Sequence, residues 1–255
     1  MSERVKDRNS RAVWPRWLRR LVVISAALAA LVIVARWPVT TRAGYNYKVS
    51  VRQWTLLEKA VAFVDRDFQL RRLSEQIAGT GGTQEQRLLR MYDWVTANLG
   101  FVPEGFPVID DHVLNIFIRQ YGTQDQRAEA LAVLASYDGM PGSTIPLGKG
   151  PKRRPIQLTV VKLDTRLVLF DVNNNIVFRR PSGELATVKD VVADPAIVKA
   201  AGRGLIVDDA PYEEHFARLG DVEVTFARME KQRFWPRLWN ETLGWLQKIG
   251  TRGAR

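Results

Sequence analysis

The chain has 255 residues, 46% of them hydrophobic, a net charge of +11 and no cysteine. Its length allows one sizeable domain or two small ones, and the lack of cysteine excludes disulfides, thiolate metal sites and a cysteine nucleophile. The charge lies at the ends, because residues 1–20 and 228–255 each hold seven Lys or Arg against two Asp or Glu. A nucleic-acid binder carries its basic surface on the folded domain, so this pattern favours a membrane surface and no nucleic-acid partner.

An apolar stretch near the N-terminus predicts a membrane anchor. Residues 21–35, LVVISAALAALVIVA, carry no charge and would span roughly 22 Å as a helix that rises 1.5 Å per residue. Flanking arginines and tryptophans can extend this length towards the roughly 30 Å of a bilayer core. We predict a basic cytoplasmic segment over 1–20, a transmembrane anchor over 21–37 and an exported domain; a signal peptide cleaved near Ala35 is the alternative. The expected membrane contacts here are Arg16, Trp17, Arg19, Arg20, Arg36 and Trp37.

Helical periodicity begins after a predicted extended linker over 38–52. Three- and four-residue spacing predicts a first amphipathic helix, which ends at the GTGG turn of residues 79–82. Its apolar face is expected to contain Trp54, Leu57, Val61, Val64 and Phe68. Thr83 and Gln86 have the spacing of a capping box at the start of a second helix. The buried face of that helix is expected to contain Leu88, Met91, Tyr92, Val95 and Leu99.

Two further helices follow a loop, FVPEGFPV. The segment DDHVLNIFIRQYG predicts a short helix that begins at Asp110 or Asp111 and ends at Gly122. The segment QYGTQDQRAEALAVLA predicts a fourth helix, which closes near YDGMPG. Thr123 can cap this helix and Gln126 can complete the cap.

The apolar period then changes from helical to strand-like. The runs STIPL, IQLTVVKL, RLVLFDV and NIVFRR are rich in Val, Ile, Leu and Phe, and the turn sequences LDTR and NNN separate them. These runs predict an antiparallel meander, after which TVKDVVADPAIVKAAGR predicts more helix. Helices followed by strands indicate an α+β fold for a domain over residues 53–227.

The C-terminal segment, residues 228–255, is basic and rich in tryptophan. As a helix it would place Trp235, Trp239, Leu246 and Ile249 on one face, with Lys and Arg beside them. Such a helix can lie in a lipid interface, which would make the chain a peripheral lipid binder; alternatively, the helix packs on the domain or on a partner. The expected membrane contacts are Trp235, Trp239 and Trp245.

The order of these elements resembles the bacterial transglutaminase-like superfamily, most of all its exported members associated with extracellular polysaccharide systems. The resemblance covers roughly residues 85–190, through LLRMYDWVTANLG, IDDHVLNIFIRQYGTQDQRAEALAVLASYDGMPG and IQLTVVKLDTRLVLFDV. It implies a papain/transglutaminase-like core, in which a helix cluster packs on an antiparallel sheet. Family members place a catalytic cysteine at a helix N-terminus, which lowers the pKa of the thiol. A histidine on the following strand removes the proton, and an aspartate at the end of the next strand orients that histidine.

The resemblance assigns a position in this chain to each of the three groups. Gln124 takes the cysteine position, and Asp171, at the end of KLDTRLVLFD, takes the aspartate position. The histidine position falls near Ile156, with Gln157 beside it, and residues 113–214 contain no histidine. A glutamine amide does not lose a proton near neutral pH. The acid is therefore kept, whereas the nucleophile and the base are both missing.

Few other residues offer the missing chemistry. His112 and Asp111 lie ahead of the fourth helix, at the start of the short one, and are candidate ligand or acid–base residues; a helix cap and a local contact are the structural explanation that we favour for them. His215 is expected on a surface helix. Asp125 lies in the first turn of the fourth helix, where negative charge is favourable. No spacing of histidines and carboxylates indicates a metal site, and no cofactor is expected.

These observations predict a pseudoenzyme: a non-catalytic binding or scaffold protein in the bacterial inner membrane, with a cytoplasmic N-terminus and a periplasmic domain. The resemblance implies envelope or polysaccharide-machinery partners and a role in extracellular polysaccharide production or export. A degenerate cleft would bind a glycan or peptide without cutting it. Its residues would be Gln124, Asp125, Ile156, Gln157 and Asp171. The alternatives are an accessory subunit of an inner-membrane complex and a glycan-directed enzyme of non-thiol mechanism, in which two carboxyl groups roughly 5–10 Å apart would act.

Overall fold

The computed structural model describes residues 15–43, 50–109, 112–148, 155–226 and 239. The chain divides into two compact units. The first comprises Met1–Thr41 and Val51–Val61, and the second comprises Arg42–Ser50 and Ala62–Arg255. The four-stranded sheet and both hydrophobic core clusters belong to the second unit.

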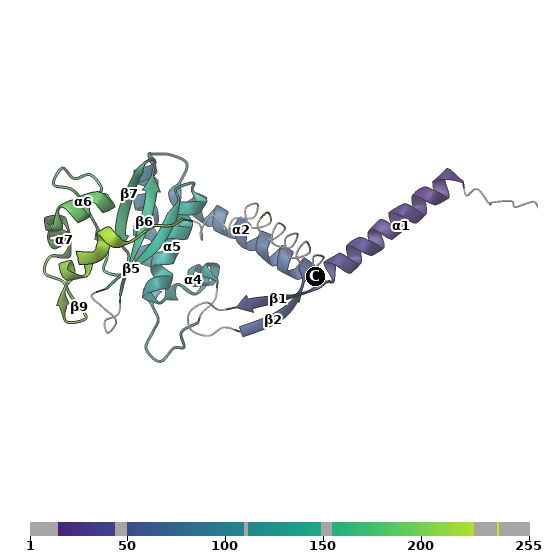
Figure 1. Ribbon diagram of the computed structural model, residues 1–255, viewed down its shortest axis with the longest axis horizontal. Helices are drawn as coiled ribbons and strands as arrows, with labels where there is room; N and C mark the ends of the chain where they lie inside the picture. Colours follow the sequence, from purple (N-terminus) through teal and green to yellow (C-terminus); the bar gives the residue numbers. More distant parts are fainter. Residues whose placement is uncertain (1–14, 44–49, 110–111, 149–154, 227–238, 240–255) are drawn as a thin grey trace, which may run out of the picture. The chain divides into compact units, whose positions relative to one another are not determined.

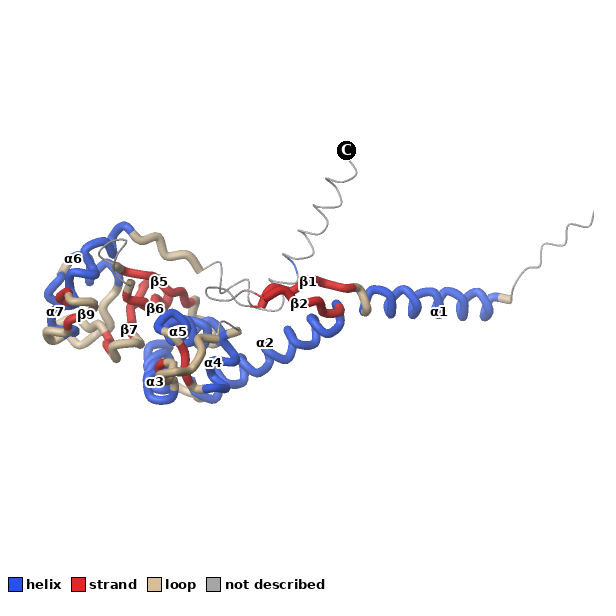
Figure 2. Tube along the Cα trace, turned by 90° about the horizontal axis from the view of Figure 1, so that it is seen from below, coloured by secondary structure: helices blue, strands red, loops and turns tan. Residues whose placement is uncertain are grey.

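The first unit begins with helix α1, Arg16–Ala35 (Figures 1 and 2). Its 20 residues are long and apolar enough to cross a membrane, and none is buried within the described part of the chain. The helix is about 30 Å long at 1.5 Å per residue, the thickness of a bilayer core, because it begins five residues before the apolar run. The predicted apolar helix is confirmed, whereas the membrane and the orientation stay predictions, since a signal sequence has the same features.

The segment 38–52 is not the extended linker expected from the sequence. Strand β1, Pro38–Ala43, pairs with strand β2, Ser50–Thr55, in a two-stranded sheet. The β-branched residues of PVTTRA favour extended backbone, and pairing satisfies backbone groups that a linker would leave to water.

Helix α2, Leu56–Ala78, confirms the first amphipathic helix but not its buried face. Four of the apolar residues behind the prediction are between 50% and 60% exposed: Leu57, Val61, Val64 and Phe68. The fifth, Trp54, lies in β2. The buried residues of α2 are Leu70, Ser74 and Ala78, and the hydroxyl of Ser74 donates to the carbonyl of Leu134 at 2.8 Å. The periodicity therefore identified the helix, but only its C-terminal part reaches the core.

Three helices follow in the second unit. They are α3, Gln84–Asn98; α4, Val113–Arg119; and α5, Gln124–Tyr137. The capping box of Thr83 and Gln86 and the predicted buried face of α3 are both confirmed. Helix α4 begins after His112 and ends at Gln120, whose φ is 59°, while residues 110–111 lie outside the described residues. A short parallel pair joins the segments before α4 and α5: β3, Gly100–Phe101, and β4, Tyr121–Gly122.

The predicted meander is confirmed as a four-stranded antiparallel sheet in the order β5-β6-β7-β8. The strands are β5, Gly142–Leu147; β6, Ile156–Leu163; β7, Arg166–Asp171; and β8, Ile176–Val177. Gly142 begins the sheet against the backbone of α5, where a Cβ would lie 2.4 Å from the carbonyl oxygen of Ala132. Only glycine fits this approach.

The remaining elements complete a mixed α+β fold, as predicted. They are α6, Val188–Ala193; α7, Pro195–Gly202; β9, Ile206–Val207; β10, Ala210–Pro211; and the 3-10 helix η1, Tyr212–Asp221. The sheet separates two cores, because α5 packs on one face and α6, α7 and η1 pack on the other (Figure 1). Residues on both faces of β6 and β7 are therefore buried.

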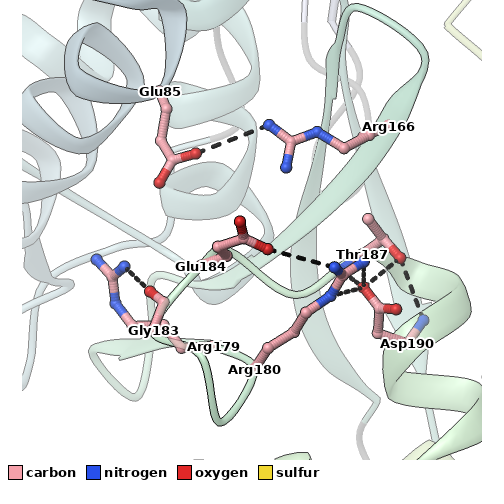
Figure 3. Close-up of polar contacts among 8 residues, drawn as sticks. All are labelled: Glu85, Arg166, Arg179, Arg180, Gly183, Glu184, Thr187 and Asp190. Carbon is pink, nitrogen blue, oxygen red and sulfur yellow. Dashed lines mark hydrogen bonds and ion pairs between the residues drawn. The ribbon is translucent and has the colours of Figure 1, made fainter.

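Polar contacts hold the connection between β8 and α6 (Figure 3). Thr187 and Asp190 form a capping box at the start of α6, and Arg180 donates to Asp190 at 2.8 Å. Arg166 of β7 pairs with Glu85 of α3 at 3.8 Å. Exposed ion pairs contribute little stability, so the cap is the contact that fixes where α6 begins.

Candidate functional site

Side chains of the first turn of α5 hold the N-terminus of this helix in place. The side-chain oxygen of Gln126 accepts the N–H of Thr123 at 3.1 Å, and its amide nitrogen donates to the carbonyl of Ile109 at 2.8 Å. A Cβ at Gly122 would lie 3.1 Å from the Gln126 side chain, so glycine allows that side chain to fold back. The hydroxyl of Thr123 donates to the carboxylate of Asp125. The carboxylate of Asp125 thus has a hydrogen-bond partner within the same helix end.

An asparagine in the β7–β8 turn joins this helix end to strand β6. The side-chain nitrogen of Asn173 donates to the carbonyl of Gln124 at 3.1 Å and to that of Gln157 at 3.3 Å. Strand alternation places the Gln157 side chain on the α5 face, where Thr159 donates to the carbonyl of Ala128. Within the described residues, the side-chain amides of Gln124 and Gln157 make no hydrogen bond. We call Gln124, Gln157 and Asn173 the amide cluster.

Asp171 ends β7 as predicted, but its carboxylate is fully buried. One oxygen accepts the backbone N–H groups of Asn173 and Asn174, both at 3.0 Å. The other accepts the side-chain nitrogen of Asn174 at 2.8 Å and the hydroxyl of Tyr212 at 2.7 Å. Two carboxylate oxygens offer about four acceptor sites, and all are used. Asp171 therefore shapes the turn that carries Asn173.

Two tyrosines are held around this turn. Tyr212 is fully buried at the start of η1, and a Cβ at Gly202 would lie 2.8 Å from its ring. Burial, reinforced by the charge of Asp171, raises the pKa of Tyr212. Tyr92 donates to the side chain of Asn175 at 3.1 Å, and burial together with Asp171 raises the pKa of Tyr92 as well. Both hydroxyls are therefore held in the neutral form.

Arg127, on the same helix end, was not among the predicted site residues. The residue is 5% exposed, and its guanidinium lies 4.2 Å from the centre of the Phe101 ring. Nη1 lies 3.4 Å from the side-chain oxygen of Asn173. Burial lowers the pKa of Arg127, against the opposing effect of Asp171. Its spacing of four from the core residue Leu131 was the one sequence signal that it faces inward.

The structure corrects the predicted place of Ile156. This side chain is 4% exposed and packs with Leu158 and Val160 in the core on the far side of the sheet from α5. Since successive strand residues point to opposite faces, the position facing the helix end is that of Gln157.

The two histidines have structural contacts. Nδ1 of His112 accepts the N–H of Leu114 at 3.1 Å, so His112 caps α4. His215 was expected at the surface, but it is 1% exposed and its Nε2 lies 3.1 Å from the carbonyl of Val207. That prediction was wrong because η1 packs this face against the second core. Asp111 lies outside the described residues.

The remaining predicted site residues lie away from the amide cluster in sequence. The arginines and tryptophans at the two ends of α1 are exposed: Arg16, Trp17, Arg19, Arg20, Arg36 and Trp37. Trp239 is 67% exposed, whereas Trp235 and Trp245 are outside the described residues. No group of His and carboxylate side chains in the described ranges could hold a metal ion. A pocket of about 570 Å³ between α6, α7 and η1 contains none of the cluster residues.

No family model and no curated protein match the chain. Among solved structures, a proposed cysteine protease from Cytophaga hutchinsonii is 16% identical over 55% of this chain and 50% of its own, with a TM-score of 0.37. A proposed protease from Parabacteroides distasonis is 13% identical over 51% and 35%, with a TM-score of 0.33. A TGase is 13% identical over 66% and 50%, with a TM-score of 0.35. The chain spans half or less of each, and at such scores its family is a proposal.

The buried tyrosine hydroxyls predict a loss of stability in alkali. Because the pKa of Tyr212 is raised in the folded state, the unfolded chain loses protons first, and the free energy of unfolding falls as pH rises above about 10. Tyr212→Phe removes a hydrogen bond to a carboxylate and is expected to cost about 1.5–3 kcal/mol at pH 8. Urea denaturation followed by circular dichroism should also show a shallower fall between about pH 10 and 12.

The matched control is Tyr121→Phe, because this ring lies against Phe106, outside the Asp171 network. In this control the free energy of unfolding should fall with pH as it does in the original chain. If it falls equally steeply in Tyr212→Phe, that result would contradict a buried, neutral hydroxyl at Tyr212.

Proposed function

We propose that this chain is a non-catalytic, membrane-anchored binding or scaffold protein, with a transglutaminase-like domain that has lost its reacting groups. The observation that carries the proposal is the amide cluster. Gln124 is the first residue of α5 and lies beside Gln157, joined to it through Asn173. In the family arrangement described above, Gln124 takes the position of the nucleophile, and Gln157 lies beside the position of the base.

The chemistry of the cluster supports binding rather than bond cleavage. An amide offers no ionisable nucleophile or base near neutral pH, whereas its oxygen accepts and its nitrogen donates hydrogen bonds. Gln124 is exposed and Gln157 and Asn173 are partly exposed, so all three can reach a ligand. Hydroxyl groups, as on a glycan, are suitable partners for such amides.

The alternative, an enzyme of non-thiol mechanism, finds less support in the same contacts. Asp171 is buried with four hydrogen bonds, Asp125 accepts from Thr123, and His112 caps α4. A general acid or base must reach the proton that it transfers. Each of these groups has a structural contact that accounts for its position.

The proposed cellular location depends on helix α1. A helix of this length and composition suits a single-pass anchor, and the basic residues before it favour a cytoplasmic N-terminus and a periplasmic domain in a bacterial inner membrane. The resemblance of residues 85–190 suggests envelope or polysaccharide-machinery partners and a role in extracellular polysaccharide production or export. An accessory role in another inner-membrane complex would share this topology.

Binding at the amide cluster is tested with the full chain in detergent micelles on an array of envelope and extracellular oligosaccharides. Gln124→Trp places a bulky ring at the start of α5 and is expected to lower the affinity for any bound glycan at least tenfold. Lys162→Trp is the control, because Lys162 is an exposed residue of β6, about 16 Å along the strand from Gln157. Equal loss in both variants, or no glycan bound by the original chain, argues against the proposal.

The topology is tested with single-cysteine variants, which are unambiguous because the chain has no cysteine. Lys199→Cys, at an exposed position of α7, should react with a membrane-impermeant maleimide in intact spheroplasts. Ser10→Cys, before the anchor, should react only after lysis. The reverse pattern would place the domain in the cytoplasm, and release of the domain without detergent would indicate a cleaved signal peptide.

A further inference from the structure

Arg127 is a buried cation at the end of a helix. It is the fourth residue of the 14-residue helix α5, and 5% of it is exposed. Its Nη1 points at Asn173, a member of the amide cluster, rather than at Asp171. The guanidinium therefore lies directly beneath the surface on which the proposed function depends.

The charge of Arg127 is poorly compensated within the described residues. No carboxylate there lies within ion-pair distance of it, and its Nε, which is shielded from solvent, has no hydrogen-bond partner. Its single hydrogen bond, to Asn173, is long at 3.4 Å. Asp171, whose charge acts on Arg127, already has its acceptor sites filled by Asn173, Asn174 and Tyr212. Buried charges are usually paired, so this arrangement calls for an explanation.

A purely structural role does not explain why the charge of Arg127 is buried with so few partners. The Phe101 ring 4.2 Å away supplies a cation–π contact, which is weaker than a desolvated ion pair. The pKa of Arg127 is lowered by burial despite the charge of Asp171. The local groups thus do not replace the hydration that the guanidinium loses on burial. Such a shortfall is expected where a negatively charged ligand binds.

The backbone at the same helix end also favours an anion. Helix N-termini carry partial positive charge and unpaired N–H groups. Within the described residues, the N–H of Gln124 has no acceptor. Two features of the described chain therefore lie within the first turn of α5: the N–H of Gln124 has no acceptor, and the buried Nε of Arg127 has no hydrogen-bond partner.

We propose that Arg127 and the N-terminus of α5 bind the carboxylate of an acidic oligosaccharide, a proposal that rests on the binding function of the amide cluster. A guanidinium fork matches a carboxylate in two hydrogen bonds. A singly charged carboxylate suits the site better than a dianionic phosphate, because Asp125 lies in the same helix turn. The bound carboxylate replaces Asn173 as the acceptor for Nη1.

The neighbouring side chains suit the sugar that would carry this carboxylate. The unpaired amides of Gln124 and Gln157 can bind hydroxyl groups. Phe101 covers the guanidinium with one ring face, and it is 50% exposed. Aromatic faces that remain accessible are suited to pack against sugar rings. A uronic acid combines the anion, the hydroxyl groups and the apolar ring face in one unit.

The direct test uses titration calorimetry on the full chain in detergent micelles, with trigalacturonate and its methyl ester as probes. Esterification removes the charge and leaves the sugar rings unchanged. We expect the free acid to bind at least tenfold more tightly than the ester, with an affinity that falls as salt rises. This comparison needs no variant, so it stands even where a substitution at Arg127 prevents folding.

The residue assignment is tested with Arg127→Gln, which keeps hydrogen-bonding capacity but removes the charge. It should bind acid and ester with equal, weak affinity, while Arg166→Gln, at a partly exposed residue paired with Glu85, should behave like the original chain. A peptide with a free C-terminal carboxylate and its amidated form make a second pair of probes. If only the free peptide binds, in an Arg127-dependent way, the carboxylate site stands and its oligosaccharide source is overturned.

The other outcomes separate this proposal from the function on which it rests. Equal binding of acid and ester, lost in Gln124→Trp, would overturn the carboxylate site and leave the binding function standing. Preference for the acid that persists in Arg127→Gln would overturn the role of Arg127. Failure of every probe to bind would overturn the acidic ligand, whereas the binding function is judged separately by the array of envelope and extracellular oligosaccharides.

Discussion

The hydrogen bond from Tyr212 to Asp171 is the contact on which the arrangement of the site depends. It joins η1 to the end of β7 in a place without solvent, at 2.7 Å. A buried carboxylate is strongly unfavourable unless its acceptor sites are filled, and the turn of Asn173 and Asn174 fills the rest. The same turn holds Gln124 and Gln157 together through Asn173. The position of the amide cluster is therefore a consequence of how one negative charge is buried.

This constraint explains why an acidic residue lies at a site proposed to be without catalysis. In a catalytic arrangement the aspartate would orient a histidine, whereas here the neighbouring strand position carries Gln157 and the carboxylate bonds to a tyrosine and a turn. Removing Asp171 would leave the buried hydroxyl of Tyr212 and the donors of the turn without their acceptor. Its presence is thus accounted for by stability alone. The buried cation nearby, Arg127, whose Nε has no hydrogen-bond partner among the described residues, is what stability alone does not account for.

Local patterns predicted most of the elements, because they are set by short-range chemistry. The capping boxes before α3 and α5, the buried face of α3 and the four strands of the meander follow from periodicity and turn residues. The buried face of α2, the burial of His215 and the side of the sheet occupied by Ile156 depend on partners distant in sequence. Gln124, Gln157 and Asp171 were identified by resemblance, whereas Arg127 and Asn173 became visible only through contacts across the fold.

The central claim is that the helix end at Gln124 binds without reacting, and turnover by the purified chain tests it most directly. The full chain, in detergent micelles, is incubated with a fluorescent primary amine and a glutamine-containing protein, and separately with peptide and oligosaccharide substrates. We predict product at the rate of buffer alone, both for the original chain and for Gln124→Trp. Turnover by the original chain that disappears in Gln124→Trp would contradict the account.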